Sequence, residues 1–204
     1  ELAGCVGITR PTEGISPVGR SALAITQALL AFHGLETSDV RLQQFLEAYL
    51  VELPAQLAQL DGVALPGVAV LLERLSEQDE IVLGLLTGNF VRGARCKLAH
   101  FDLDQFFERE GDLFGGFGDD ERERDDGARR AWEVARSALG PLDPEQVWVI
   151  GDTPLDVQCA RAISARVLAV GTGVFSVSAL EATQPDALLA DLEATEQVID
   201  LLVS

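Results

Sequence analysis

Residues 147–156 constrain the fold most, because an apolar strand there runs directly into a helix that carries two carboxylates. Residues 147–150 form a short apolar run that is typical of a buried parallel strand. Gly151 permits a sharp exit from that strand, and Pro154 suits the first turn of a helix. Asp152 is therefore expected at the carboxyl end of a strand, where open α/β sheets bind their ligands.

The two acidic residues of this segment, Asp152 and Asp156, are four residues apart and are expected on one face of the helix. Mg²⁺ takes oxygen ligands and is commonly held by one or two carboxylates together with water and substrate phosphate. The spacing therefore predicts a metal site. The alternative is that Asp152 caps the helix and Asp156 only complements its dipole.

A second apolar run, residues 81–86, also leads into a polar turn and a predicted helix. The turn is Thr87-Gly88-Asn89, and the helix is expected over residues 90–100. A hydroxyl and backbone N–H groups at the start of a helix can bind an anion. Threonine and asparagine are also ordinary turn and cap residues, so this motif gains weight only together with the acidic pair.

The remaining pattern is helical first and alternating afterwards. Helices are expected over residues 22–32 and 42–53, with the second bent or ended by Pro54. Further strands are expected over residues 113–117, 147–150, 167–170 and 187–189. Helices between strands favour parallel pairing with right-handed crossovers, so the sequence predicts an α/β fold.

With these motifs in place, the chain resembles the haloacid dehalogenase-like hydrolase superfamily, and within it the phosphoglycolate phosphatase-like members with a helical cap. Residues 65–68 resemble the start of the family's core domain, and 85–89 resemble its second motif. The resemblance implies that Thr87, Gly88 and Asn89 bind phosphate. Residues 151–156 resemble the fourth motif, which implies that Asp152 and Asp156 hold Mg²⁺.

The third motif of the family supplies a basic residue that balances charge, and the best match here is Arg124 in residues 117–124. Arg122, Arg129 and Arg130 lie close by and remain alternatives. The resemblance also implies a Rossmann-like core over residues 64–204 and a helical cap over residues 1–63. Within that cap Arg20 is expected to reach toward the substrate.

The family's first motif, an apolar strand that ends in Asp-x-Asp-Gly-Thr, does not occur in these 204 residues. Residues 102–104 read Asp-Leu-Asp but follow no apolar strand, so we expect them to form a turn. The chain contains no methionine. We therefore expect that the sequence begins inside the cap and lacks the first core strand with its nucleophile, although a relative that never had the motif remains an alternative.

Composition narrows the classes of partner. With 33 acidic and 15 basic residues, the formal net charge is −18, which opposes nucleic acid binding. No apolar run is long enough to span a membrane, and three cysteines at no metal spacing favour a cytoplasmic protein without a disulfide framework. The expected partner is a small phosphorylated metabolite, and the expected state is a monomer or homodimer.

Together these features predict a Mg²⁺-dependent phosphomonoester hydrolase, similar to phosphoglycolate phosphatase, that acts through an aspartyl-phosphate. The nucleophilic aspartate would lie upstream, so the 204-residue chain is expected to be inactive. One alternative is a catalytically inactive protein that binds phosphate and metal in the same pocket. Haloacid dehalogenase chemistry is less favoured, because it requires no cation and no paired carboxylates.

Overall fold

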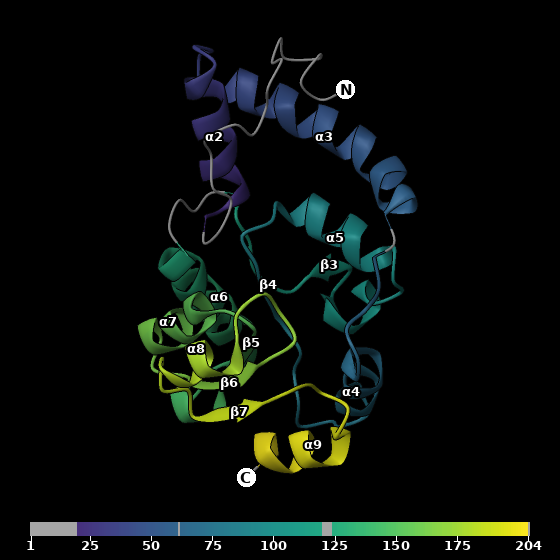
Figure 1. The fold of residues 1–204 in the computed structure, drawn as a ribbon, viewed down its shortest axis with the longest axis vertical. Coiled ribbons are helices and arrows are strands. Elements are labelled where there is room, and N and C mark those ends of the chain that lie inside the picture. Colours follow the sequence, from purple (N-terminus) through teal and green to yellow (C-terminus); the bar gives the residue numbers. More distant parts are fainter. Residues whose placement is uncertain (1–19, 61, 120–123, 204) are drawn as a thin grey trace. The chain divides into compact units, whose positions relative to one another are not determined.

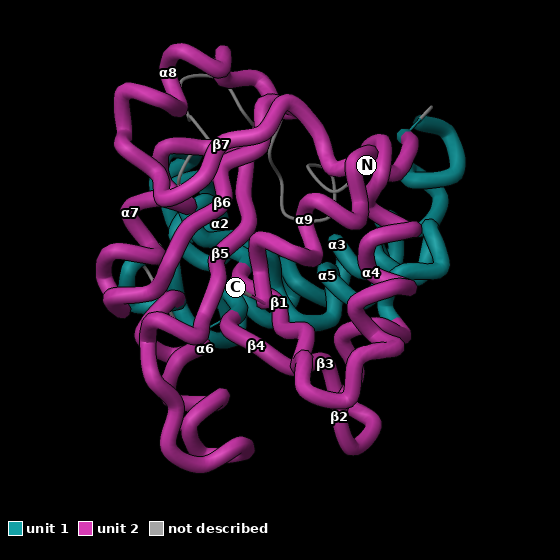
Figure 2. The backbone as a smooth tube through the Cα atoms, turned by 90° about the horizontal axis from the view of Figure 1, so that it is seen from below, with its two compact units in different colours: residues 1–62, 87–104, 117–127 teal, residues 63–86, 105–116, 128–204 magenta. Residues whose placement is uncertain are grey.

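The computed structural model describes residues 20–60, 62–119 and 124–203, and the chain divides into two compact units (Figure 2). Unit 1 comprises residues 1–62, 87–104 and 117–127, and unit 2 comprises residues 63–86, 105–116 and 128–204. The contacts thus group the first 62 residues with two later segments. The division into a cap over 1–63 and a core over 64–204 stays a prediction.

Unit 1 is helical and contains α2 (Ala22–Phe32), α3 (Asp39–Gln59) and α5 (Val91–Ala99) (Figure 1). The hydroxyl of Ser21 caps α2 by accepting a hydrogen bond from the Ala24 N–H at 3.1 Å. Helices α3 and α5 pack against each other. Glu47 of α3 also accepts a hydrogen bond from the guanidinium of Arg92 in α5 at 2.6 Å. The predicted helices over 22–32 and 90–100 are therefore confirmed.

Pro54 lies inside α3, which continues to Gln59, so of the two expected effects, a bend or an end, the end is wrong. A proline removes one backbone hydrogen bond and leaves the others of a long helix in place. The neighbouring side chain of Leu53 is buried, with 8% of its surface exposed. Its burial stabilises the segment around the proline.

Unit 2 contains parallel strands at the predicted places, except that the strand predicted over 113–117 is divided: Leu113 ends an antiparallel strand, and only Gly115–Gly116 form a parallel strand. Strand β5 (Trp148–Gly151) pairs with β6 (Arg166–Val170), and β6 pairs with β7 (Ala187–Leu189), all in parallel. A separate parallel pair joins β1 (Leu85–Leu86) to β4 (Gly115–Gly116). The other elements are the hairpin of β2 (Glu108–Arg109) and β3 (Asp112–Leu113), the helices α4 (Val68–Ser76), α6 (Arg124–Leu139), α7 (Pro154–Ala162), α8 (Val177–Glu181) and α9 (Thr195–Val203), and the short 3₁₀ helices η1 (Asp104–Phe107) and η2 (Pro144–Gln146).

The core of unit 2 lies on both faces of β6, whose side chains alternate between two clusters. Leu168 and Val170 pack with residues of α4 and α9. Val167, on the opposite face, packs with Val157 and Ala160 of α7. Burial on both faces is typical of a parallel strand in an α/β sheet, so the predicted α/β class is confirmed.

Each parallel sheet of unit 2 has outer edges that pair with no further strand among the described residues, and the edges of β1 and β5 are two of them. β5 pairs only with β6, and β1 pairs only with β4. Apolar side chains near these edges are exposed, with 38% of the surface of Ile150 and 44% of that of Val82 accessible. The apolar run 81–86 enters a ladder only at its last two residues.

The Asp-Leu-Asp sequence at residues 102–104 forms a turn, as predicted. Asp102 adopts a left-handed backbone conformation with φ of 56°, and Leu103 is buried. The 3₁₀ helix η1 begins at Asp104. These residues therefore do not occupy the place after an apolar strand that the family's first motif requires.

Candidate functional site

Thr87, Gly88 and Asn89 form a tight turn that directly follows β1. The Thr87 hydroxyl oxygen accepts hydrogen bonds from the Asn89 backbone N–H at 3.2 Å and from its side-chain amide at 2.8 Å. Among the described residues, neither the Thr87 O–H nor the Gly88 N–H has an acceptor. The turn therefore presents donors that can bind an oxyanion.

The backbone of this turn is held by other segments of unit 1. The Ala22 N–H donates to the Gly88 carbonyl at 2.6 Å, and the Gly118 N–H donates to the Asn89 carbonyl at 2.8 Å. Asp119 accepts a hydrogen bond from the Val91 N–H at 2.7 Å, so it caps α5 from a position 28 residues away. The sequence did not reveal this contact, because nothing local to α5 indicates a remote cap.

Lys97 is the site residue that the sequence reasoning missed. Its ammonium donates to the Asn89 side-chain oxygen at 2.6 Å from the last turn of α5. Burial lowers the pKa of this ammonium below its ordinary value. The composition could have drawn attention to this residue, because Lys97 is the only lysine among the fifteen lysine and arginine residues.

The acidic pair lies where β5 ends and α7 begins, as predicted, but the cap of the helix is neither acid. Thr153 is the N-cap, and its hydroxyl accepts from the Asp156 N–H at 3.3 Å. The Asp156 carboxylate in turn accepts from the Thr153 N–H at 3.0 Å and from its hydroxyl at 2.9 Å. This reciprocal arrangement is a capping box, so Asp156 has a structural role in α7.

The carboxylates of Asp156 and Asp152 occupy positions that a side chain at Gly151 or Gly173 would block. A Cβ atom at Gly151 would lie 2.3 Å from the Asp156 carboxyl carbon, and one at Gly173 would lie 2.0 Å from an Asp152 carboxyl oxygen. Real Cβ atoms do not approach so closely, so larger residues at either position would displace an acid. The Gly171-Thr-Gly173 turn therefore accommodates the Asp152 side chain.

The donor set of this segment fits a hard cation with few protein ligands. Asp152 is half-buried and makes no hydrogen bond or ion pair with any described residue, which leaves its oxygens available. No group of three or more acidic, histidine or cysteine side chains forms a cage in the described part of the chain. Mg²⁺ commonly keeps several waters and binds through one or two carboxylates and phosphate, so the residues present fit such a site.

The predicted basic residues are placed differently. Arg124 begins α6, but its side chain lies outside the described residues. Arg20 donates to the Ala24 carbonyl at 3.0 Å, which ties its guanidinium to the first turn of α2. Of the alternatives to Arg124, Arg130 pairs with Glu133 at 3.4 Å, and Arg122 is not described. The roles of Arg124 and Arg20 stay predictions.

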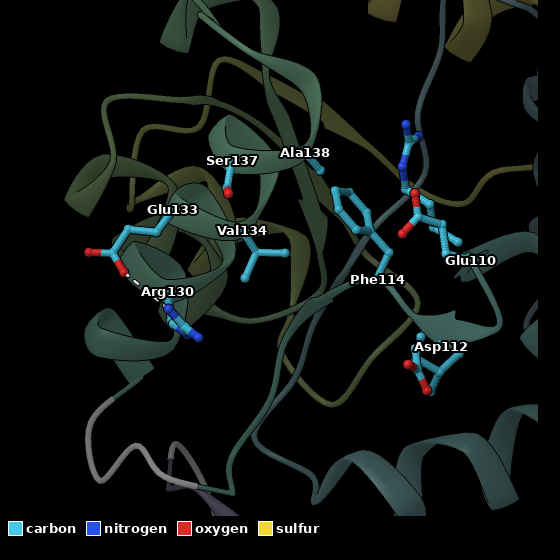
Figure 3. A pocket seen from close by; sticks show the side chains of 10 residues that line it. Glu110, Asp112, Phe114, Arg130, Glu133, Val134, Ser137 and Ala138 are labelled. Carbon is cyan, nitrogen blue, oxygen red and sulfur yellow. Dashed lines mark hydrogen bonds and ion pairs between the residues drawn. The ribbon is translucent and has the colours of Figure 1, made fainter.

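A hollow of about 680 Å³ lies in unit 2 between the β2–β3 hairpin and α6 (Figure 3). Glu110, Asp112 and Phe114 line one side, and the ion pair of Arg130 and Glu133 lies on the other. Neither the Thr87 turn nor Asp152 contributes to it. Because its charges are of mixed sign and partly paired, we do not assign it to an anionic substrate.

The structure therefore brings the predicted residues together in two groups, each described within its own unit. Thr87, Gly88 and Asn89 form the turn in unit 1, and Asp152 and Asp156 flank the start of α7 in unit 2. None of the described helices is both long and apolar enough to cross a membrane.

Solved structures share this fold. A hydrolase from Pseudomonas syringae aligns over 100% of this chain and 89% of its own, with 19% identity and a TM-score of 0.68. A protein described as a predicted phosphoglycolate phosphatase from Haemophilus somnus aligns over 89% of this chain and 79% of its own, with 18% identity and a TM-score of 0.64. A haloacid dehalogenase-like family hydrolase from Streptococcus pneumoniae aligns over 98% and 86%, with 20% identity and a TM-score of 0.59.

Comparison with curated proteins gave no match. Two family models do match the sequence. The model of haloacid dehalogenase-like hydrolases covers residues 12–161, and a related model of HAD-like hydrolases covers residues 128–195. The first match spans more than half of the chain and includes both the Thr87 turn and the start of α7. The chain belongs to the haloacid dehalogenase-like hydrolase family.

Proposed function

We propose that this chain is part of a Mg²⁺-dependent phosphomonoester hydrolase that acts on a small phosphorylated metabolite. The observation that carries the proposal is the Thr87 turn, which leaves a hydroxyl and a backbone N–H without an acceptor among the described residues. Such donors suit the oxygens of a phosphoryl group. The phosphoglycolate phosphatase-like neighbour supports the same class of substrate.

In this proposal Asp152 is the carboxylate that holds Mg²⁺, and Asp156 supports it while it completes the capping box of α7. When bound, the cation offsets the negative charge that slows attack on a phosphate ester. Thr87 and the Gly88 N–H hold two other phosphoryl oxygens, and Asn89 orients the Thr87 hydroxyl. The proposal requires that the carboxyl ends of β1 and β5 face the same substrate.

We further propose that the nucleophile is an aspartate on a strand that these 204 residues do not contain. The edges of β1 and β5 have no partner strand among the described residues, and the side chains of Val82 and Ile150 near them are exposed, which supports an additional strand beside them. The aspartate oxygen would attack phosphorus while the ester P–O bond breaks and the leaving oxygen takes a proton. Water would then hydrolyse the aspartyl-phosphate.

The cytoplasmic location is part of the same proposal. Neither Cys96 nor Cys159 forms a disulfide, as is usual in a reducing compartment. Arg124 and Arg20 are proposed to balance charge and to contact the substrate, respectively. A monomer or homodimer suffices for these roles.

The test measures hydrolysis of p-nitrophenyl phosphate and of small phosphomonoesters with and without Mg²⁺. The 204-residue chain is expected to show no turnover, whereas a longer product of the same reading frame that carries Asp-x-Asp-Gly-Thr is expected to be active. Asp152→Asn in the longer protein should abolish Mg²⁺-dependent turnover.

Two results would redirect the assignment. If the full reading frame lacks the motif while the protein still binds phosphate, the protein is an inactive binding module. Release of halide from 2-haloacids without Mg²⁺ would instead assign it to dehalogenase chemistry.

A further inference from the structure

Three polar groups of unit 1 form a continuous chain of hydrogen bonds that ends at the Thr87 hydroxyl. The Lys97 ammonium donates to the Asn89 side-chain oxygen at 2.6 Å, and the Asn89 amide nitrogen donates to the Thr87 hydroxyl oxygen at 2.8 Å. Helical side chains lean toward the start of their helix, so the Lys97 side chain in the last turn of α5 points back toward Asn89, two residues before the helix begins. The contact therefore follows from the helix geometry.

These hydrogen bonds determine whether the Thr87 hydroxyl can donate to a ligand or accept from it. A threonine hydroxyl has one proton and two acceptor lone pairs. Asn89 supplies two donors to this oxygen, its backbone N–H at 3.2 Å and its side-chain amide at 2.8 Å. With both lone pairs engaged, Thr87 can interact with a ligand only as a donor.

Lys97 fixes this arrangement because an ammonium has donors and no acceptor. It can bind the Asn89 oxygen but not the amide nitrogen, so the nitrogen has to face Thr87. Without Lys97, the Asn89 amide is free to rotate by half a turn. Its oxygen would then accept the Thr87 proton and remove the donor from the site.

The charge of Lys97 is also not neutralised nearby. It is half-buried, and no described carboxylate forms an ion pair with it. In a chain with a formal net charge of −18, a half-buried cation without an acidic partner among the described residues is unusual. An anion held by the Thr87 turn would account for it.

We propose that Lys97 is a positioning residue that locks the Asn89 amide and thereby makes the Thr87 hydroxyl an obligate donor to a ligand oxygen. The site then favours a ligand that presents a hydrogen-bond acceptor to Thr87, as the oxygens of a phosphoryl group do. This inference rests on the proposed function, since it assumes that the Thr87 turn binds phosphate.

The sole lysine makes the test direct. When lysine is labelled with ¹³C at Cε and ¹⁵N at Nζ, the protein gives one side-chain signal. Titration of the 204-residue chain with inorganic phosphate at constant ionic strength, with chloride as the control anion, is expected to shift that signal and the Asn89 side-chain amide signals together. The same titration yields the dissociation constant.

The variants separate positioning from charge. Lys97→Met keeps the length of the side chain and removes the donor, and it should weaken phosphate binding by about tenfold, the effect of one lost hydrogen bond to a charged group. Lys97→Arg should restore most of the affinity. Thr87→Val should weaken binding by a similar factor, and adding Lys97→Met to it should change little more, because both act through one hydroxyl.

Each outcome decides a separate point. If wild-type protein does not bind phosphate, the proposed function fails. If wild type binds and Lys97→Met binds equally well, or if the two substitutions are additive, the positioning role is overturned. Should Lys97→Met fail to fold, Asn89→Ala replaces it, with the same loss expected and with retained affinity overturning the proposal.

Discussion

Asp156 and Asp152 are close in sequence but should respond differently to substitution. Asp156 is buried, with 9% of its surface exposed, and its carboxylate accepts two hydrogen bonds from Thr153. Replacing it by alanine removes both bonds and leaves the Thr153 N–H without this acceptor. We expect a loss of about 2–3 kcal/mol in the free energy of unfolding, the sum of a lost cap and an unsatisfied buried donor.

Asparagine at position 156 retains one acceptor for the Thr153 N–H, so its cost should be smaller, about 1 kcal/mol. Asp152→Asn should change the stability of the metal-free protein by less than about 0.5 kcal/mol, because no described residue bonds to that carboxylate. Urea denaturation followed by far-UV circular dichroism measures all three. For a protein of this size the alanine variant should melt about 5–10 °C lower.

A stable Asp156→Ala protein would refute this reasoning. An unfolding free energy within about 0.5 kcal/mol of wild type would mean that the capping box contributes no more than an ordinary surface contact. A loss at Asp152→Asn as large as that at Asp156→Ala would instead show that Asp152 is a structural residue and not an available ligand.

Two further predictions concern other contacts. Gly173→Ala would place a Cβ atom 2.0 Å from an Asp152 carboxyl oxygen. We expect the carboxylate to move, so that Mn²⁺ binding, measured by electron paramagnetic resonance, weakens with little change in melting temperature. Unchanged Mn²⁺ binding would contradict the proposal that Asp152 is a metal ligand. The hydrogen bond from Arg92 lowers the pKa of Glu47, so its stabilising effect should be present above the unfolded-state pKa and lost as the pH falls through the lower folded-state pKa. Arg92→Met should return the Glu47 pKa, measured by ¹³C NMR, toward its ordinary value, and an unmoved pKa would show that the contact does not form.

The strands and the two polar turns could be predicted from sequence because their signals are local. Apolar runs, a glycine exit and an early proline describe β5 and α7 without reference to the rest of the chain. The N-cap could not be assigned between Asp152 and Thr153 by pattern, since both residue types cap helices. The sequence around Pro54 left open whether the helix bends or ends there, because the burial of Leu53 beside it depends on the tertiary structure.

The contacts that organise the Thr87 turn were not predictable, because they join residues far apart in sequence. Lys97 reaches Asn89 only when α5 has formed. Because the Asn89 amide is neutral, no pattern of opposite charges in the sequence indicates this pair. Asp119 and Gly118 approach the turn from a segment about thirty residues away. Periodicity reports which face of a helix is apolar, but it does not report which loop docks on its end.

The cap that Asp119 provides for α5 also bears on the order in which the protein folds. The first N–H group of that helix, at Val91, donates to a carboxylate 28 positions later in the chain. A nascent α5 therefore lacks its cap until the chain has closed that loop, and loop closure carries an entropic cost before any contact is gained. In the transition state for folding, substitutions at Asp119 should give φ-values near zero even if the middle of α5 is already helical.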